Sequence, residues 1–290
     1  MRWKKVQGKG DVQDRRGGGG GMMGGGGLPI PGGKAGGGLG LIVLVVLSLL
    51  LGTNVVGGGG GGADSGLTPG GFDSAPAGTS TIPEENTTFE FTKFVSKDAQ
   101  DFWQTQFQST DRTYQRAPVV IFTSGTQSGC GPASSATGPF YCPADHKVYL
   151  DLSFFNELSR RFGAPGDFAA AYVIAHELAH HVQGELGIEA KMRDLQRENP
   201  DRANEYSVKL ELQADCLAGV WAHSVNKRGN LDPGDIDEGL AAAAAVGDDR
   251  LGARSPEQWT HGSSELRVKW FRAGFKGGDS GACDTFSAEL

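Results

Sequence analysis

The sequence predicts an α+β domain that is mainly helical with a small β-sheet, preceded by a single transmembrane helix and disordered glycine-rich segments. Three observations lead to this prediction. Glycine is concentrated at the beginning, where 27 of the 47 glycines fall within the first 71 residues. An uncharged apolar run follows, and the remainder combines long helical patterns with short apolar runs typical of strands. We therefore divide the chain into a tail, a span, a linker and one folded domain.

The tail covers residues 1–38 and is basic. It carries seven basic residues against two acidic ones, a balance of +5, so the rest of a chain of net charge −7 carries −12. A segment of this composition buries too little apolar surface to offset the entropy of ordering, and we expect a disordered cytoplasmic tail. The acidic excess of the rest argues against nucleic acid as a partner.

The span covers residues 39–56, which include no charged side chain. Such a run is just long enough to cross a hydrocarbon core about 30 Å thick, so the lipid bilayer is an expected partner. The alternative is a cleaved signal peptide, but its leader would be unusually long and no A-x-A site follows. Positive charge precedes the span, which predicts a single-pass protein of the cell membrane with its N-terminus in the cytoplasm and its domain periplasmic or extracellular.

The linker covers residues 57–83 and the folded domain residues 84–290. Glycine, serine, threonine and proline dominate the linker, which predicts a flexible tether. Within the domain, periodicity predicts helices at 94–114, 153–162, 231–246 and 263–275 and strands at 118–122 and 147–151.

The centre of the domain is the stretch 172–183, which contains His176-Glu177-Leu178-Ala179-His180. Its alanines favour a helix, on which histidines four residues apart share one face and can hold one metal ion. Glu177 lies beside that face, within reach of a water on the ion. The pattern therefore indicates a catalytic Zn²⁺ that activates water, with Glu177 taking the proton. The alternative is a core helix with two hydrogen-bonded histidines.

A catalytic zinc usually has three protein ligands. Glu211 and Asp215 share one face of a predicted helix farther along the chain. We expect Glu211 to be the third ligand and Asp215 to accept the free ring N–H of a ligating histidine. A solvated Glu211, or Asp215 as the ligand, are the alternatives.

H-E-x-x-H followed by E-x-x-x-D resembles the Glu-zincin metallopeptidases. Further segments resemble a bacterial group called the "putative neutral zinc metallopeptidase" family, and they are spread over the chain between residues 128 and 286: 128–131, 138–143, 148–151, 212–216, 261–264 and 283–286. The resemblance implies a zincin-like catalytic domain, a zinc metalloendopeptidase activity and a peptide or protein substrate. The resembling zincins hold an extended substrate along an exposed strand, which here could be the strand at Tyr149.

A peptidase of this kind needs a donor for the oxyanion that forms when water attacks a carbonyl. His261, in a loop before a helix, is the candidate, with Tyr149 and Tyr141 as weaker ones. The alternative for His261 is a residue that packs or caps at the helix entry. His181 is expected to point away from the metal face, and His146 to be structural or solvent-facing.

A different function stays open, namely a membrane-tethered, non-catalytic binding or assembly factor that retains a structural zinc site. Glu177 would have no role in such a site, and structural sites usually have four protein ligands.

Four cysteines lie in the part placed outside the membrane, where paired thiols persist. Of the three possible connectivities we prefer Cys130 with Cys142, and Cys216 with Cys283. The first pair would close a short loop, and the second would attach the C-terminal tail to the Glu211 helix. Metal binding by cysteine is the alternative, although C-x2-C spacing is absent from the sequence.

Overall fold

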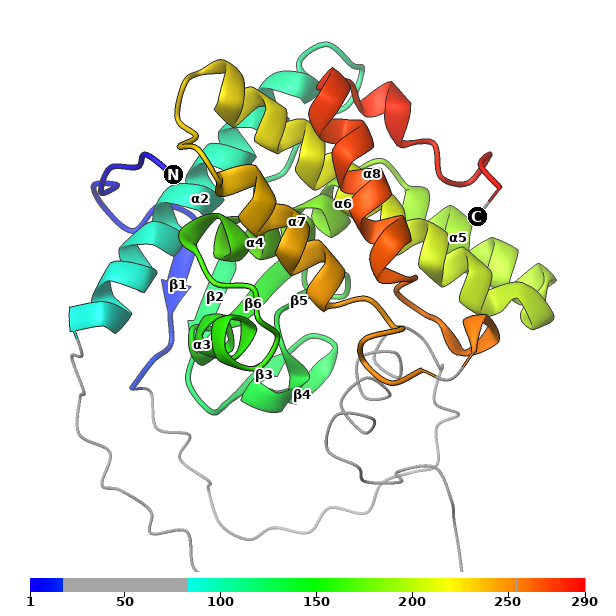
Figure 1. The fold of residues 1–290 in the computed structure, drawn as a ribbon, viewed down its shortest axis with the longest axis horizontal. Coiled ribbons are helices and arrows are strands. Elements are labelled where there is room, and N and C mark those ends of the chain that lie inside the picture. Colours follow the sequence, from blue (N-terminus) through cyan, green and yellow to red (C-terminus); the bar gives the residue numbers. More distant parts are fainter. Residues whose placement is uncertain (18–82, 254, 290) are drawn as a thin grey trace, which may run out of the picture.

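The computed structural model describes residues 1–17, 83–253 and 255–289 (Figure 1). The expected class is confirmed, because these residues form a mainly helical α+β domain with a small mixed sheet. The strands are β1 (Val12–Asp14), β2 (Val119–Phe122), β3 (Gly125–Ser128), β4 (Gly131–Ser134), β5 (Phe140–Cys142) and β6 (Lys147–Asp151). The α-helices are α2 (Pro83–Phe107), α3 (Ser153–Arg160), α4 (Asp167–Glu185), α5 (Ile188–Glu198), α6 (Ala203–Lys227), α7 (Asp235–Ala245) and α8 (Ser264–Gly277).

The main sheet has the strand order β1-β2-β6-β5, with β5 antiparallel to β6 and the other pairs parallel. Alternate side chains of β2 and β6 enter different clusters, as the period of a strand requires. One face of the sheet joins the large core around α4, and the other forms a small cluster that includes Val120, Phe122 and Tyr149. Strands β3 and β4 form a separate antiparallel hairpin.

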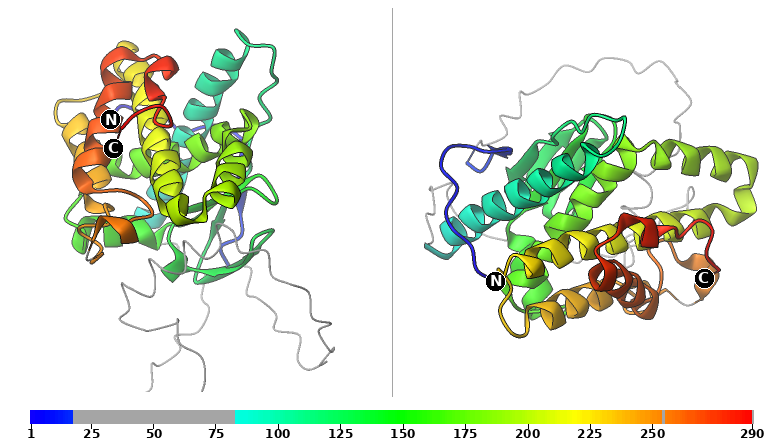
Figure 2. Two further views of the ribbon diagram at one scale, coloured as in Figure 1. Left: turned by 90° about the vertical axis from the view of Figure 1, so that its right-hand side faces the viewer. Right: turned by 90° about the horizontal axis from the view of Figure 1, so that it is seen from above.

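Helix α4 is the centre of the molecule and is buried along most of its length. The sheet and α2 lie on one side of it, and α6, α7 and α8 lie on the other (Figures 1 and 2). Its alanines allow neighbouring elements to approach on every side, which suits a helix with no solvent-exposed face. The metal-site motif is therefore carried by a helix that packs against other elements on several sides.

Helices α6 and α8 approach each other closely at glycine. A Cβ built on Gly274 would come within 1.9 Å of the Cys216 carbonyl oxygen, and one on Gly219 within 2.2 Å of the Phe271 carbonyl oxygen. Only glycine fits at these two positions, and the resulting contact brings the side chains of α8 against the face of α6 that carries Asp215.

The expectation of a disordered tail is wrong for residues 1–17. Val12 is buried and aligned with Val119 in the parallel pair of β1 and β2, and Trp3 packs edge-on against Phe91. The α-amino group of Met1 lies 2.7 Å from Asp167, the first residue of α4. A three-residue strand with one buried side chain leaves almost no periodic pattern, so composition alone suggested a solvated segment. Residues 18–38 lie outside the described residues.

The predicted membrane arrangement conflicts with this strand pairing. No helix within the described ranges is both long and apolar enough to cross a membrane, and the expected span at 39–56 lies outside those ranges. Strand β1 precedes that run and β2 follows it, yet the two are hydrogen-bonded neighbours. A single crossing by residues 39–56 would put Val12 and Val119 on opposite sides of a bilayer. A tail on one side with the whole domain on the other is therefore incompatible with the sheet.

Several expected elements differ in extent. The first domain helix begins at Pro83 rather than near residue 94, and ends at Phe107. Helix α5 and the hairpin of β3 and β4 were not predicted. The strand that carries Tyr149 is internal, because β6 lies between β2 and β5, so the possibility that an extended substrate pairs with this strand does not hold. The edge of the sheet on this side is β5.

Both disulfides have the preferred connectivity. Cys130 is bonded to Cys142, and Cys216 to Cys283. The first joins the β3–β4 hairpin to β5, and the second attaches the C-terminal segment to α6 beside Asp215.

Candidate metal centre

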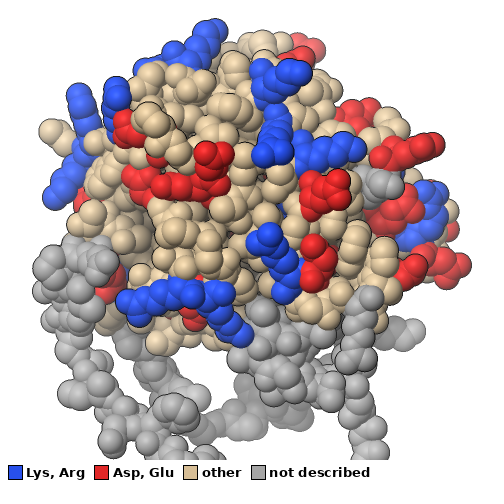
Figure 3. Space-filling model, viewed as in Figure 1, with Lys and Arg blue, Asp and Glu red and all other residues tan. Residues whose placement is uncertain are grey.

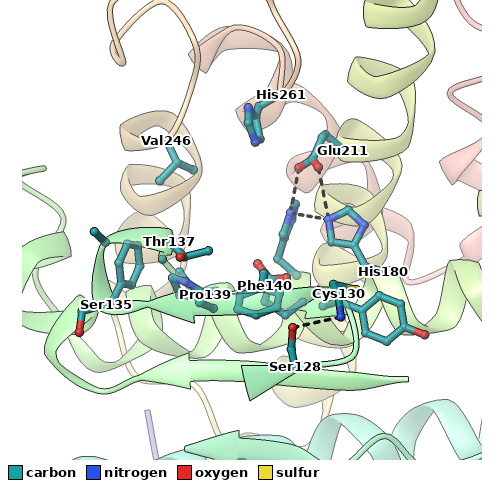
Figure 4. Close-up of a pocket in the computed structure, with 18 of the residues that line it drawn as sticks. Ser128, Cys130, Ser135, Thr137, Pro139, Phe140, His180, Glu211, Val246 and His261 are labelled. Carbon is teal, nitrogen blue, oxygen red and sulfur yellow. Dashed lines mark hydrogen bonds and ion pairs between the residues drawn. The ribbon is translucent and has the colours of Figure 1, made fainter. Parts of the chain in front are cut away.

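Three side chains from two helices converge on one point in the interior of the domain. His176 and His180 lie one turn apart on α4, and α6 packs against α4 so that Glu211 faces both rings (Figure 4). The two Nε2 atoms are 3.1 Å apart. Glu211 Oε2 lies 3.2 Å from Nε2 of His176, and Oε1 lies 3.5 Å from Nε2 of His180.

Hydrogen bonds on the far side of each ring fix which nitrogen faces this point. Nδ1–H of His176 donates to Asp215 Oδ1 at 2.9 Å, and Nδ1–H of His180 donates to Gln183 Oε1 at 2.8 Å. Each ring therefore turns an Nε2 lone pair toward the other ring and toward a carboxylate. Three electron-pair donors at this separation repel one another unless a cation or protons lie between them.

The donor set and its dimensions fit a zinc ion. Zinc binds imidazole nitrogen and carboxylate oxygen at about 2.0–2.1 Å, which makes the edge of a tetrahedron about 3.3 Å. The 3.1 Å between the two Nε2 atoms and the 3.2 Å between His176 Nε2 and Glu211 Oε2 match that edge, and the other carboxylate oxygen of Glu211 lies 3.5 Å from His180 Nε2. Three protein ligands leave one corner for water, which is the composition of a catalytic rather than a structural zinc site.

Without a metal, protons take the place of the cation. Burial lowers the pKa of His176, but the carboxylates of Asp215 and Glu211 outweigh burial and raise the pKa to about 9. Burial raises the pKa of Glu211, and the two histidines more than reverse this, so that it ends well below its usual range. The cluster therefore favours a positive charge at its centre. A zinc ion must compete with protons for the same ligand atoms.

Behind His176 lies a buried network around Asp215, whose side chain is fully buried. Arg267 of α8 donates from Nε to Asp215 Oδ2 at 2.8 Å and from Nη2 to Oδ1 at 3.0 Å. The hydroxyl of Tyr172 also donates to Asp215. Burial raises the pKa of Asp215, but Arg267 and His176 outweigh burial and lower it. Asp215 is thus an ionised acceptor that holds His176 in one tautomer and one orientation.

A cavity of about 610 Å³ opens beside the cluster. His176, Glu177, His180 and Glu211 all line it, and much of the remaining wall is apolar. Glu177 is 8% exposed and follows His176 directly in α4. The structure therefore brings together the three expected ligands and the expected base at the wall of one cavity large enough for several substrate side chains.

The loop that carries His261 is held by one carboxylate. The backbone N–H groups of Thr260, His261 and Gly262 donate to Asp248 Oδ2 at 2.7, 2.7 and 2.9 Å. Nδ1 of His261 lies 3.2 Å from the other carboxylate oxygen. His261 also lines the cavity, and its ring lies near Glu211 (Figure 4). The structure thus places the expected oxyanion donor at the cavity wall.

The two weaker candidates occupy different places. Tyr149 is not among the residues that line the cavity, because it faces the small cluster on the other face of the sheet and donates its hydroxyl to Asp145. Tyr141 lines the cavity, but its hydroxyl contacts the rings of His146 and His181. The expectation for Tyr149 is therefore wrong.

Three residues that organise the centre were missed in the sequence. Gln183 could have been found, because it follows His180 by three residues on the same helix, a spacing that brings the side chains together. Tyr172 lies one turn before His176 by the same rule. Arg267 is 52 residues from its partner Asp215, and no local pattern indicates that a cation in a later helix is buried against an acid in an earlier one.

Comparison with known proteins identifies the family. The family model described as "Putative neutral zinc metallopeptidase" matches residues 1–286. The chain belongs to this family. YpfJ of Escherichia coli is 47% identical over 218 residues, which are 73% of this chain and 76% of that protein. Rv2575 of Mycobacterium tuberculosis is 46% identical over 191 residues, which are 60% of this chain and 64% of that protein. Both are named as uncharacterized proteins, and no solved structure matches the chain.

Membership in the zinc metallopeptidase family implies a zinc cofactor, and the match begins at residue 1. The matched range includes β1, in agreement with a domain whose sheet starts before the glycine-rich region.

The acidic and basic side chains on the face shown in Figure 3 are interspersed, without a continuous basic surface on that face.

Proposed function

We propose that this chain is a zinc metalloendopeptidase that hydrolyses peptide bonds, with Glu177 as the general base. The observation that supports the proposal most strongly is the cluster of His176, His180 and Glu211, which has the dimensions of a three-ligand zinc site and lies with Glu177 on the wall of an open cavity. A purely structural zinc site would need neither a coordination position left for water nor an adjoining cavity.

His176, His180 and Glu211 would hold the ion. When bound there, zinc supplies Lewis acidity and lowers the pKa of water toward about 7. Glu177 would accept a proton at its carboxylate as water attacks the peptide carbonyl, and would then deliver it to the leaving amine nitrogen. His261, whose Nδ1 lies 3.2 Å from Asp248 Oδ1, would donate from Nε2 to the developing oxyanion. Asp215 and Gln183 keep the ring nitrogens of both ligands oriented.

An extended peptide would bind along β5. Among the described strands, β5 is the terminal strand of the sheet on the α4 side, and it contacts α4. Phe140 and Tyr141 of this strand line the cavity. A substrate strand could pair with its free edge and present a carbonyl group to the metal centre.

The two disulfides support an oxidising compartment outside the cytoplasm as the place of action, because paired thiols persist there. If residues 39–56 contact a membrane, the pairing of β1 with β2 requires residues 12–14 and the domain to lie on the same side of it.

The experiment compares the full chain with its Glu177→Gln variant for zinc content and for hydrolysis of casein, an unstructured protein substrate. Glu198→Gln, an exposed change at the end of α5, is the matched control. We expect one catalytic zinc in all three proteins, cleavage by the wild type and by Glu198→Gln, and a rate reduced at least about 100-fold in Glu177→Gln. Undiminished cleavage by Glu177→Gln would contradict the role of the base. Bound zinc without cleavage in any protein would favour the non-catalytic binding or assembly factor.

A further inference from the structure

A second group of potential metal ligands lies on another face of α4. His146, His181 and Glu185 each offer one ligand atom, and these atoms lie within 4.8 Å of one another. Successive residues of a helix are about 100° apart, so His181 points away from the face shared by His176 and His180. His181 and Glu185 are themselves one turn apart and share a face. We propose that these three residues form a second site for a divalent transition-metal ion of the zinc class.

His181 has the hydrogen bonds of a metal ligand. Its side chain is buried, and its Nε2–H donates to the backbone carbonyl of Gln115. This bond fixes the tautomer, so Nδ1 carries a lone pair. In known sites a ligating imidazole almost always donates its other N–H to a carbonyl or carboxylate in this way. Nδ1 points toward the Tyr141 hydroxyl at 3.3 Å.

Glu185 is oriented by the same peptide segment. Its Oε2 accepts the backbone N–H of Gln115 at 3.2 Å. Gln115 therefore holds the imidazole through its carbonyl and the carboxylate through its N–H. A carboxylate has two oxygens with two lone pairs each, so this hydrogen bond is compatible with ligation of an ion.

His146 completes the group from the turn between β5 and β6. Its backbone adopts φ 54°, a left-handed conformation that is uncommon outside glycine, and its ring is exposed. Its Nδ1 lies 3.2 Å from the Tyr141 hydroxyl. The ring centroids of His146 and His181 are 6.5 Å apart. The Tyr141 hydroxyl thus contacts both rings, although its single proton can serve only one ring nitrogen.

The chemistry of the donors selects the metal. Two imidazoles and one carboxylate suit zinc, cobalt, nickel or iron(II) rather than calcium or magnesium, which prefer oxygen ligands. The ring centroids of His146 and His181 are 6.5 Å apart, against 4.7 Å for His176 and His180, so the exposed turn of His146 must close in to bind. The second ion should therefore bind more weakly than the first and fill after it.

Occupation of this site would join three segments that are distant in sequence, namely the β5–β6 turn, the C-terminal half of α4 and the segment before β2. An ion that binds only the folded form stabilises it by mass action. It would also sit beside Tyr141, whose strand forms the wall of the cavity.

The test counts zinc ions per chain at saturation by equilibrium dialysis of the full chain, stripped of metal and free of any affinity tag. The wild type should bind two ions, His146→Ala and Glu185→Gln one each, and the control Glu198→Gln two. Glu211→Ala should still bind one ion, at the second site, and Glu211→Ala combined with His146→Ala none.

The counts separate this inference from the proposed peptidase function, because the second ion is measured in a protein whose first cluster is broken. One ion per wild-type chain at saturation would overturn the second site. So would a second ion that persists unchanged in both His146→Ala and Glu185→Gln. Weak binding to scattered surface groups would appear as an ion count unaffected by any of these changes.

Discussion

His176 donates its Nδ1–H to the carboxylate of Asp215 across 2.9 Å, deep in the contact between α4 and α6. This one bond decides that the other ring nitrogen faces His180 and Glu211. Asp215 is fully buried and is ionised because Arg267 lies against it. The geometry of the candidate zinc site therefore depends on residues that would never touch the metal.

Asp215→Asn tests that dependence. The amide removes the negative charge that holds both the His176 N–H and the Arg267 guanidinium, so we expect zinc affinity to fall about 10- to 100-fold. Competition with a chromophoric chelator measures the dissociation constant. Asp237→Asn, an exposed change on α7, is the control and should leave it unchanged. Equal affinities for both variants would show that Asp215 does not position the ligand.

Arg267 is expected to matter for stability as well as for the site. Arg267→Met leaves the charge of Asp215 buried without a partner, which should cost about 3–5 kcal/mol of the free energy of unfolding. Denaturant titration measures this cost. Arg272→Met on the exposed side of the same helix is the control and should cost less than about 0.5 kcal/mol. Similar costs at the two positions would show that the network around Asp215 does not stabilise the fold.

Strand β1 should be an integral part of the domain. Val12→Asp puts a charge at a position that is 6% exposed within the sheet, so we expect a loss of about 3 kcal/mol or more. Gln13→Asp, at an exposed position of the same strand, is the control. Thermal unfolding of the full-length variants compares them. If the two variants unfold at the same temperature, β1 is not docked in solution.

The anchoring of the His261 loop should depend on pH. Burial raises the pKa of Asp248, but the hydrogen bonds and charge of His261 and the backbone N–H groups outweigh burial and lower it. The folded pKa is therefore below the unfolded value of about 3.9. The stabilisation by this carboxylate is complete above that value and is lost as the pH falls through the folded pKa.

Asp248→Asn should accordingly lower the free energy of unfolding by about 2 kcal/mol at pH 7. The difference between wild type and variant should shrink at pH 3, as measured by urea titration at both values. A difference that stays constant or grows in acid would contradict the assignment of Asp248 as an ionised anchor.

The parts of the site that could be predicted from the sequence are those set by helix periodicity. His176 and His180, and Glu211 and Asp215, are each four residues apart, so a helix alone places each pair on one face. The disulfide pairing was chosen from three possibilities by chain length and context. The packing of α8 on α6 depends on Gly219 and Gly274, and its consequence, the contact of Arg267 with Asp215, exists only in three dimensions.

The sheet was the least predictable part. Val12 contributes one buried side chain to a strand of three residues, beside Asp11 and Asp14, which made the segment look solvated. Its pairing with β2 spans more than a hundred residues of sequence and the whole glycine-rich region. That pairing joins residues 12–14 to the domain, so the predicted topology, with the tail and the domain on opposite sides of a membrane, was wrong because of one short strand.

The most direct test of the central claim follows hydrolysis while zinc is added to the metal-free full chain. If His176, His180 and Glu211 hold the ion that Glu177 works with, hydrolysis should be absent without metal and reach its maximum with the first equivalent of zinc. Glu211→Ala should not recover it at the same zinc concentration. Hydrolysis by the metal-free protein, or full recovery in Glu211→Ala, would contradict the account.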